Sequence, residues 1–194
     1  DAIDASNLTA EEKDALKKQV SDEVNKAKAA IDGATKDADV KTAQTNGEKA
    51  INNVNVPDTS ATKDAAKNAI DQAAKAKNDA IDASNLTAEE KDALKKQVSD
   101  EVNKAKAAID GATKDADVES AKNTGVETIN NMPTTSATKD AAKNAIDQAA
   151  KAKNDAIDAS NLTAEEKDAL KKQVSDEVNK AKAAIDGATK DADV

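Results

Sequence analysis

The 194-residue sequence contains no cysteine, histidine, phenylalanine, tyrosine, tryptophan or arginine. Without histidine and cysteine it lacks the usual zinc and copper ligands, the usual general base near neutral pH and the thiolate nucleophile. We therefore expect no enzyme activity, no catalytic residues, no cofactor and no metal site. The absence of cysteine fits either a cytosolic protein or the cysteine-poor exterior of a Gram-positive cell, and does not choose between them.

Charge and hydropathy exclude two further kinds of partner. The 29 basic residues are all lysine and stand against 38 acidic ones, for a net charge of −9. An acidic chain without arginine or aromatic side chains offers neither an attractive field for phosphates nor stacking surfaces for bases, so we expect no nucleic-acid binding. No apolar run approaches the roughly 20 residues that span a bilayer, and no signal-peptide pattern occurs, so we expect no membrane insertion.

Apolar residues are present, but most of them are small. They form 38% of the chain, and 44 of them are alanine, against 12 valine, 10 isoleucine, 6 leucine and one methionine. A core built from these residues is aliphatic and thin, unlike the core of an ordinary globular domain of this length.

The sequence is repetitive. Asp1–Val40 recurs letter for letter at Asp79–Val118 and at Asp155–Val194, with offsets of 78 and 76 residues. A second block, Ser60–Asn78, recurs unchanged at Ser136–Asn154. Such identity at surface as well as core positions exceeds what folding requires, and it indicates recent duplication of a coding unit.

The first two segments of each repeat have helical periodicity. After Ser60, an expected N-cap, apolar residues recur at spacings of three and four up to about Ser84, and most of them are alanine. Thr87 and Glu90 have the spacing of a capping box, which starts a second helix that ends near Gly111, an expected C′ residue. The strongest apolar stripe of the chain lies on this second helix, at Leu94, Val98, Val102, Ala105, Ile109 and Ala112.

A third, shorter helix is predicted to begin near Lys114, with Thr113 as its cap, and to stop before Pro133. Its apolar face includes Gly125, and Gly47 holds the same position in the preceding copy. Because glycine within a helix costs about 1 kcal/mol relative to alanine, an inward glycine indicates close approach of a neighbouring helix backbone.

These patterns predict an all-α protein of tandem three-helix bundles arranged end to end as an elongated rod, in which neighbouring repeats of the same chain are each other's partners. The expected domains are an N-terminally truncated repeat at 1–57, a complete repeat at 58–133 and a C-terminally truncated repeat at 134–194. A register in which one unit comprises the second, the third and the next first helix stays open. Pro133 and its neighbours suggest a stiff linker, and Asn55–Asp58 a looser one.

The motifs and their order resemble the helical repeat of giant cell-wall-anchored proteins of Gram-positive bacteria, including Ebh-like extracellular-matrix-binding proteins and other staphylococcal, streptococcal and lactobacillar surface adhesins. The resemblance covers the whole chain. It is carried by Ala80-Ile81-Asp82, Asn85-Leu86-Thr87, Glu89-Glu90-Lys91, Asn103-Lys104-Ala105, Ala108-Ile109-Asp110, Asp117-Val118 and Ala121-Lys122-Asn123-Thr124-Gly125. It implies an extracellular array anchored to the cell wall, with roles in adhesion, aggregation or envelope integrity and with no catalytic residues. The sequence of Lys41–Lys49 differs from that of the later copy, although its helical pattern is intact.

Two local motifs allow a functional interpretation beside a structural one. Glu89 and Glu90 beside Asp92 could be a carboxylate pair or a calcium site, but acidic residues in the first turn of a helix are already favoured by its dipole. Asn85 and Asn7 each begin a glycosylation sequon, but the sequon threonine already serves as an N-cap. We expect the structural role in both cases.

The leading hypothesis for function is a non-catalytic stalk that projects a binding region from a bacterial cell wall. The alternative is a weak adhesive module, in which many copies bind a host matrix protein such as fibronectin, or other cells, with avidity. A third possibility is a disordered, stress-protective chain, since hydropathy is low and charge is high. The capping boxes and the helical spacing of the large aliphatic residues favour folded bundles.

Overall fold

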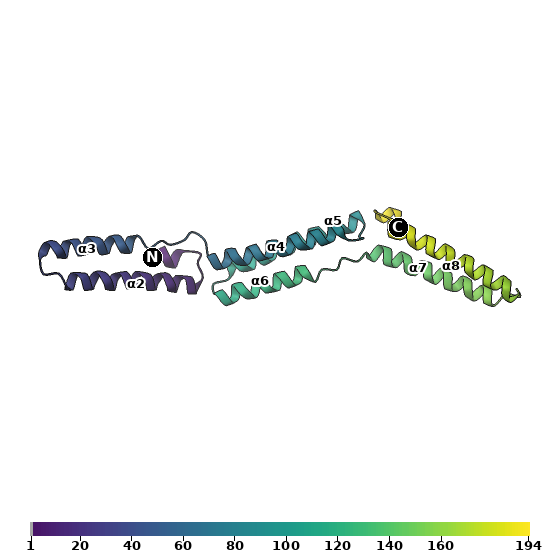
Figure 1. The fold of residues 1–194 in the computed structure, drawn as a ribbon, viewed down its shortest axis with the longest axis horizontal. Coiled ribbons are helices and arrows are strands. Elements are labelled where there is room, and N and C mark those ends of the chain that lie inside the picture. Colours follow the sequence, from purple (N-terminus) through teal and green to yellow (C-terminus); the bar gives the residue numbers. More distant parts are fainter. Residues whose placement is uncertain (1) are drawn as a thin grey trace. The chain divides into compact units, whose positions relative to one another are not determined.

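The structure, a computed structural model, describes residues 2–194 and is all-α, which confirms the predicted fold class (Figure 1). No strand occurs among the described residues. The elements are α1 (Ala2–Ala5), α2 (Ala10–Asp32), α3 (Asp37–Asn52), α4 (Ala61–Ala83), α5 (Ala88–Gly111), α6 (Asp115–Asn130), α7 (Ala137–Asp158), α8 (Ala164–Gly187) and the short 3-10 helix η1 (Asp191–Asp193).

Side chains cap the predicted helix starts. The capping box is confirmed at Thr87, whose hydroxyl accepts from the Glu90 amide while the Glu90 carboxylate accepts from the Thr87 amide. The same reciprocal pair starts α2 and α8. Ser60 caps α4 as predicted, because its Oγ accepts from the amide of Lys63 at 3.1 Å. These bonds satisfy amides that have no partner within the helix.

The predicted helix boundaries are confirmed, but two of the predicted cap residues differ in detail. Helix α5 does end at Gly111, but no residue of the described chain has a positive φ, so no glycine closes a helix in the left-handed conformation expected of a C′ residue. Gly33 closes α2 with φ −80° and ψ −9°, which is right-handed backbone that any residue adopts. The N-cap of α3 is Lys36 rather than Thr35, the counterpart of the predicted Thr113, and it makes no side-chain cap bond.

The chain divides into two compact units. Unit 1 comprises Asp1–Ala73 and Glu101–Ile129, and unit 2 comprises Ala74–Asp100 and Asn130–Val194. Each unit therefore contains one outer repeat together with part of the middle repeat, and α4 and α5 contribute to both.

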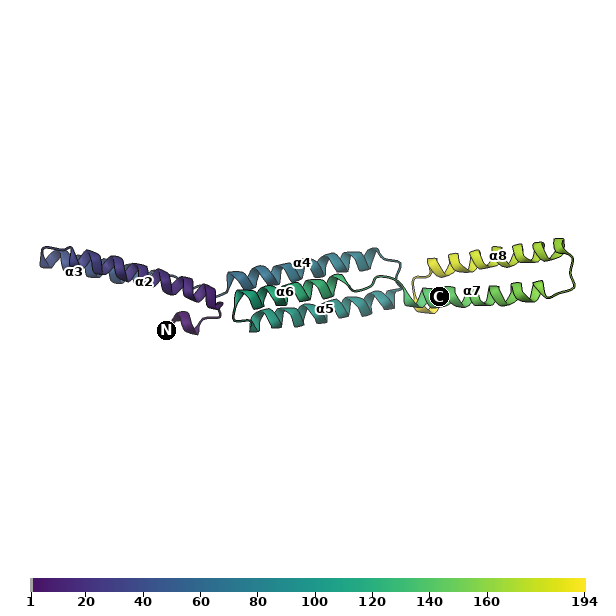
Figure 2. The same ribbon diagram turned by 90° about the horizontal axis from the view of Figure 1, so that it is seen from below.

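In unit 1, α2 and α3 form an antiparallel hairpin, while the first half of α4, the second half of α5 and α6 lie side by side (Figure 2). A methyl group added at Gly125 of α6 would lie 2.6 Å from Ala105 Cβ and 2.8 Å from Ile70 Cδ1. At Gly47 of α3 it would lie 2.4 Å from Ala27 Cβ. Both glycines thus admit a neighbouring helix at close range, which confirms the prediction drawn from their inward position.

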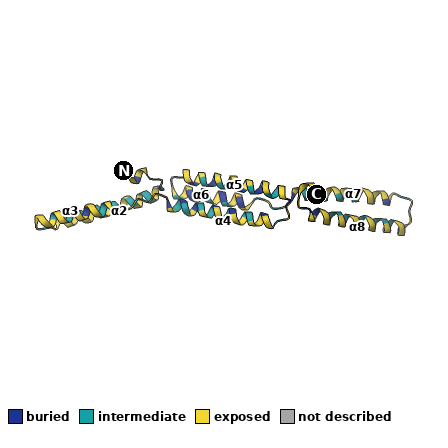
Figure 3. Ribbon diagram, turned by 90° about the horizontal axis from the view of Figure 1, so that it is seen from above, coloured by how far each residue is buried: buried dark blue, intermediate teal, exposed yellow. Residues whose placement is uncertain are grey.

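In unit 2, α7 and α8 form a second antiparallel hairpin (Figure 3). Ile157 of α7 and Ile185 of α8 are buried. The linker after α6 is held by Lys77 of α4, whose Nζ donates to the carbonyl oxygens of Asn130 at 2.8 Å and Met132 at 2.7 Å. These bonds satisfy carbonyls at the end of α6, where a lysine also complements the helix dipole.

Candidate functional site

The most elaborate polar site in unit 1 lies where the first repeat meets the second. We call it the first joint. It brings together the α1–α2 turn (6–12), the start of α4 (60–63) and the α5–α6 connection (110–115). The second joint, in unit 2, brings together the α4–α5 turn (84–90), the start of α7 (136–139) and the connection from the end of α8 to the start of η1 (186–191).

A buried lysine lies at the centre of the first joint. Lys63 is only 3% exposed, and its Nζ donates to the carbonyl oxygen of Asp110 at 2.9 Å and to Oδ1 of Asn7 at 3.4 Å. Burying a charge is costly unless it is hydrogen-bonded, and a cation beside the last carbonyls of a helix is favoured by the helix dipole. Lys63 therefore ties the turn of one repeat to the end of α5 in the next.

Glu12 has two roles in the same joint. Its Oε2 accepts from the Thr9 amide at 2.9 Å as part of the capping box, while its Oε1 accepts from the Thr62 amide, in the first turn of α4, at 3.1 Å. Burial alone would raise the pKa of this carboxyl. The hydrogen bonds from the Ser60 hydroxyl and from the Thr9 and Thr62 amides outweigh it and lower the pKa to about 2.

Two further bonds attach the turn to the start of α6. Glu11 Oε2 accepts from the Asp115 amide at 3.0 Å, and the Ala10 amide donates to the Thr113 carbonyl at 2.8 Å. The adjacent glutamates of one repeat thus cap two helices of the following repeat. Each carboxylate lies at the positive end of a helix dipole and satisfies an amide that the helix itself leaves without a partner.

The second joint repeats the first almost atom for atom. Lys139, 2% exposed, donates to the Asp186 carbonyl at 2.9 Å and to Asn85 Oδ1 at 3.1 Å. Its other bonds run from the Thr138 amide to Glu90 at 3.0 Å, from the Asp191 amide to Glu89 at 3.0 Å, and from the Ala88 amide to the Thr189 carbonyl at 2.8 Å. Hydrogen bonds at the second joint, as at the first, lower the pKa of Glu90 to about 2, against the effect of burial.

An apolar residue marks the same contact. Leu8 and Leu86 are 6% and 7% exposed within their joints, whereas Leu162, at the equivalent turn of the last repeat, is 39% exposed. Thr9 and Thr87 are fully buried, and Thr163 is exposed. The same turn is therefore buried at the two places where another repeat follows it. It is exposed in the last repeat, which no further repeat follows among the described residues.

Of the residues considered as a carboxylate pair, a calcium site or glycosylation sequons, Asp92 is exposed, and the others have structural partners. The Glu89 and Glu90 carboxylates accept from helix amides, and the Asn7 and Asn85 side chains accept from lysine. Within residues 2–194, no group of three or more His, Cys, Asp or Glu side chains is placed to hold a metal ion. The absence of catalytic residues stays a prediction.

Sequence reasoning missed Lys63 and Lys139, because lysines on a helix of mixed charge are usually solvated. It also missed that the second carboxylate oxygen of Glu12 and of Glu90 caps a helix of the next repeat. The capping box already gave a reason for a glutamate at that position. The differing linkers suggested joints of different stiffness, whereas the two joints use equivalent donors and acceptors. The segment Ser-Ala-Thr-Lys recurs at the start of α4 and of α7, but identical duplication of the whole block does not reveal that its serine and lysine are the buried residues.

None of the helices in residues 2–194 combines the length and the hydropathy needed to cross a bilayer. No curated protein matches the chain, and no solved structure does. Three segments, 1–59, 62–136 and 138–194, match a family described as a domain of unknown function, DUF1542. Because these matches cover almost the whole sequence, the chain belongs to this family and is an array of its repeats.

Proposed function

We propose that the chain is a non-catalytic stalk, built from repeats that hold one another in register and project a binding region from a bacterial cell wall. The observation that carries this proposal is the recurrence of the joint: the same donors and acceptors join repeat one to repeat two and repeat two to repeat three. Because the joint is duplicated together with the repeat, every added copy is attached in the same way. This suits a protein whose function depends on the number of its repeats.

The joint supports the role of a spacer, because each repeat supplies hydrogen-bond partners that the next repeat needs. The glutamates of one turn cap the helix starts of the following repeat, and the buried lysine of that repeat reaches back to the turn. With domain limits at 1–57, 58–133 and 134–194, both joints fall between repeats. A helix of 23 residues such as α4 is roughly 35 Å long at 1.5 Å per residue, so each added repeat contributes a length of this order.

The non-catalytic role is proposed from composition, since the sequence has no histidine, cysteine or arginine. The extracellular, wall-anchored location is proposed from the resemblance to Gram-positive surface proteins.

Small-angle scattering of arrays with increasing numbers of repeats tests the stalk. We expect the largest dimension to grow in equal steps with repeat number. The double variant Lys63→Ala, Lys139→Ala should bend at the joints and give a smaller dimension at the same helical content. A largest dimension that does not grow with repeat number would overturn the proposal.

Adhesion makes a different prediction for the same arrays. If the repeats themselves bind fibronectin or whole cells weakly, avidity should rise steeply with repeat number. The stalk requires no binding at any length. Titration of short and long arrays against immobilised fibronectin, with circular dichroism to verify folding, separates the two roles and also tests the disordered alternative.

A further inference from the structure

The helices of this chain obtain their N-terminal caps in two ways. Helices α2, α4, α5, α7 and α8 carry a cap of their own, a serine or threonine whose hydroxyl accepts from a backbone amide. These residues are Thr9, Ser60, Thr87, Ser136 and Thr163. The third helices of the repeats differ. The N-caps of α3 and η1 are Lys36 and Lys190, and neither makes a side-chain cap bond.

At the joints, the preceding repeat supplies what the third helix lacks. The amide of Asp115, the first residue of α6, donates to Glu11 at 3.0 Å, across 104 positions of the sequence. The amide of Asp191, the first residue of η1, donates to Glu89 at 3.0 Å. A carboxylate at a helix start satisfies an amide that the helix leaves without a partner and is favoured by the helix dipole. Both bonds therefore stabilise the first turn of a helix in the following repeat.

The threonine cap of the second helix takes part in the same contact. Thr87 Oγ1 accepts from the Glu90 amide at the start of α5, and its hydroxyl donates to Asp191 Oδ1 in the next repeat. One hydroxyl thus serves two helix starts. At the first joint the equivalent groups are Thr9, which is fully buried, and Asp115, whose Oδ1 is buried without a hydrogen-bond partner. A bond from the Thr9 hydroxyl to this oxygen would satisfy both groups.

The following repeat supplies a partner in return. The amide of Ala10, the first residue of α2, donates to the Thr113 carbonyl just before α6 at 2.8 Å. The Ala88 amide at the start of α5 donates to the Thr189 carbonyl at the same distance. Because the two helix starts at each joint are bonded to each other, neither can fray without leaving a polar group of the other unpaired.

We propose that the contact of Thr9 and Glu11 with Asp115, which we call the shared cap, couples the local unfolding of neighbouring repeats. When the first turn of α2 opens, the shared cap is lost and the first turn of α6 opens with it. The second joint links α5 to the third helix of the last repeat in the same way. Coupling of this kind is reciprocal, so each repeat protects its neighbour from fraying.

Amide hydrogen exchange of the full chain, followed by NMR, tests the coupling. The reporters are the amides of Asp117 and Val118, which donate to the Lys114 carbonyl at 3.1 Å within the first turn of α6. They can be assigned despite the repeats, because the sequence Glu119–Lys122 follows them only here.

Removal of the acceptor is the first arm of the test. Glu11→Ala leaves the Asp115 amide without its acceptor and changes no residue of α6. It should accelerate exchange at the reporters about tenfold, as expected for the loss of a hydrogen bond to a charged group. The matched control is Asp14→Ala, which removes the same charge from an exposed position of α2 and should leave the reporters unchanged.

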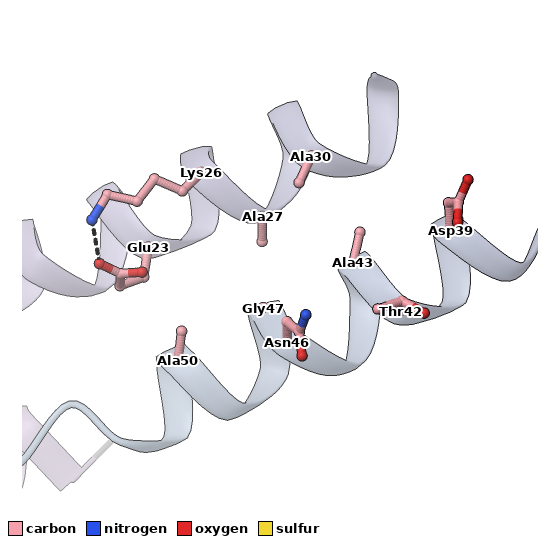
Figure 4. A pocket seen from close by; sticks show the side chains of 10 residues that line it. All are labelled: Glu23, Lys26, Ala27, Ala30, Asp39, Thr42, Ala43, Asn46, Gly47 and Ala50. Atoms are coloured by element: carbon pink, nitrogen blue, oxygen red, sulfur yellow. Dashed lines mark hydrogen bonds and ion pairs between the residues drawn. The ribbon is translucent and has the colours of Figure 1, made fainter. Parts of the chain in front are cut away.

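A substitution away from the joint tests whether opening is transmitted. Figure 4 shows Gly47 of α3 facing Ala27 of α2, and a Cβ at Gly47 would lie 2.4 Å from Ala27 Cβ. Ala27 lies 17 residues after Ala10, roughly 25 Å along the helix. Gly47→Leu should separate α3 from α2, which faster exchange in α2 verifies, and the reporters in α6 should then exchange faster as well. In the Glu11→Ala background, Gly47→Leu should add little.

Three results would overturn the proposal. One is a reporter exchange rate that Glu11→Ala raises no more than Asp14→Ala does. Another is unchanged exchange in α6 after Gly47→Leu has loosened α2, because the repeats would then open independently. The third is an effect of Gly47→Leu that is undiminished in the Glu11→Ala background, because the opening would then bypass the shared cap. Repeats that open independently can still add equal lengths, so this proposal and the scattering test of the stalk fail separately.

Discussion

The segments Ala10–Gly33 and Ala88–Gly111 have the same amino-acid sequence in different surroundings. No residue of α2 is buried, although its apolar stripe is identical to that of α5, where Leu94, Val98 and Ile109 are buried. The difference arises from the neighbours. Ala105 of α5 and Ile70 of α4 both lie within 3 Å of the position that a Cβ at Gly125 of α6 would take, so three helices meet there. Among the described residues, helix α2 packs chiefly against α3 and the four-residue α1.

The turns that precede these helices also differ in burial although their sequences are identical. Leu86 is buried against the following repeat, and the identical Leu162 is largely uncovered. An apolar stripe or a capping box therefore fixes a helix and its start, but not the degree of burial, which depends on how many neighbouring helices are present. Within these 194 residues only the middle repeat has all three of its long helices, α4, α5 and α6, so it should be the most stable part of this chain.

The largest expected effect contrasts Ile70 with Ile146, its counterpart in the last repeat. Ile70 is fully buried and Ile146 is half-buried. Ile70→Ala should lower the free energy of unfolding by about 2–5 kcal/mol, as for other large-to-small core substitutions. Ile146→Ala should cost roughly 1 kcal/mol, because less apolar surface is lost from the core. Urea unfolding followed by circular dichroism measures both, and equal losses would show that the middle repeat is not better packed.

The second contrast concerns the inward glycines. Gly125→Ala should destabilise by about 1–3 kcal/mol, because Ala105 and Ile70 leave no room for the new methyl group and α6 has to move. Gly47→Ala meets Ala27 alone, and α3 can shift without disturbing a third helix, so the loss should be smaller. Thermal melts of the two variants compare them directly.

Gly111→Ala is the control, and it should change the free energy of unfolding in the opposite direction. No atom lies within 4 Å of the position that its Cβ would take, and its φ is not positive. The substitution should therefore stabilise by about 0.5–1 kcal/mol through helix propensity. A loss of stability at Gly111 would mean that backbone effects, rather than crowding, explain the result at Gly125.

The helices and their capping boxes were predictable because they depend on residues three or four apart. The inward glycines were predictable for the same reason, since their place on the apolar stripe reveals which face they occupy. The joints were not. Lys63 and Lys67 look alike in the sequence, yet Lys63 is buried on the Asp110 carbonyl and Lys67 pairs with a carboxylate. That distinction depends on contacts 47 residues apart, which no local periodicity records.

The third contrast separates a joint lysine from a surface lysine of the same helix. Lys139→Met leaves the Asp186 carbonyl and the Asn85 side chain without their donor, and should cost about 1–2 kcal/mol. Lys151→Met removes an exposed pair with Asp155 and should cost less than about 0.5 kcal/mol. The melting temperatures of the two variants provide the measurement. Equal effects would mean that the joint contributes no more than a surface ion pair.

The smallest expected effect is a pH dependence of the joints. The pKa of Glu12 and of Glu90 is about 2 in the folded chain, against an ordinary value of 4.5. Below pH 4.5 the unfolded chain binds more protons at these groups than the folded chain does, so their stabilisation is complete above that pH and is lost as the pH falls towards 2. The double variant Glu12→Gln, Glu90→Gln should flatten this part of the stability profile.

Glu166→Gln is the matched control, because Glu166 makes the capping-box bonds with Thr163 but has no second repeat to cap among the described residues. It should change the acid side of the profile less than Glu90→Gln does. Circular dichroism melts between pH 2 and pH 4.5, the window set by the two pKa values, compare the variants. If all three glutamates contribute alike, the acid sensitivity belongs to the capping box, and the contact with the next repeat adds nothing to it.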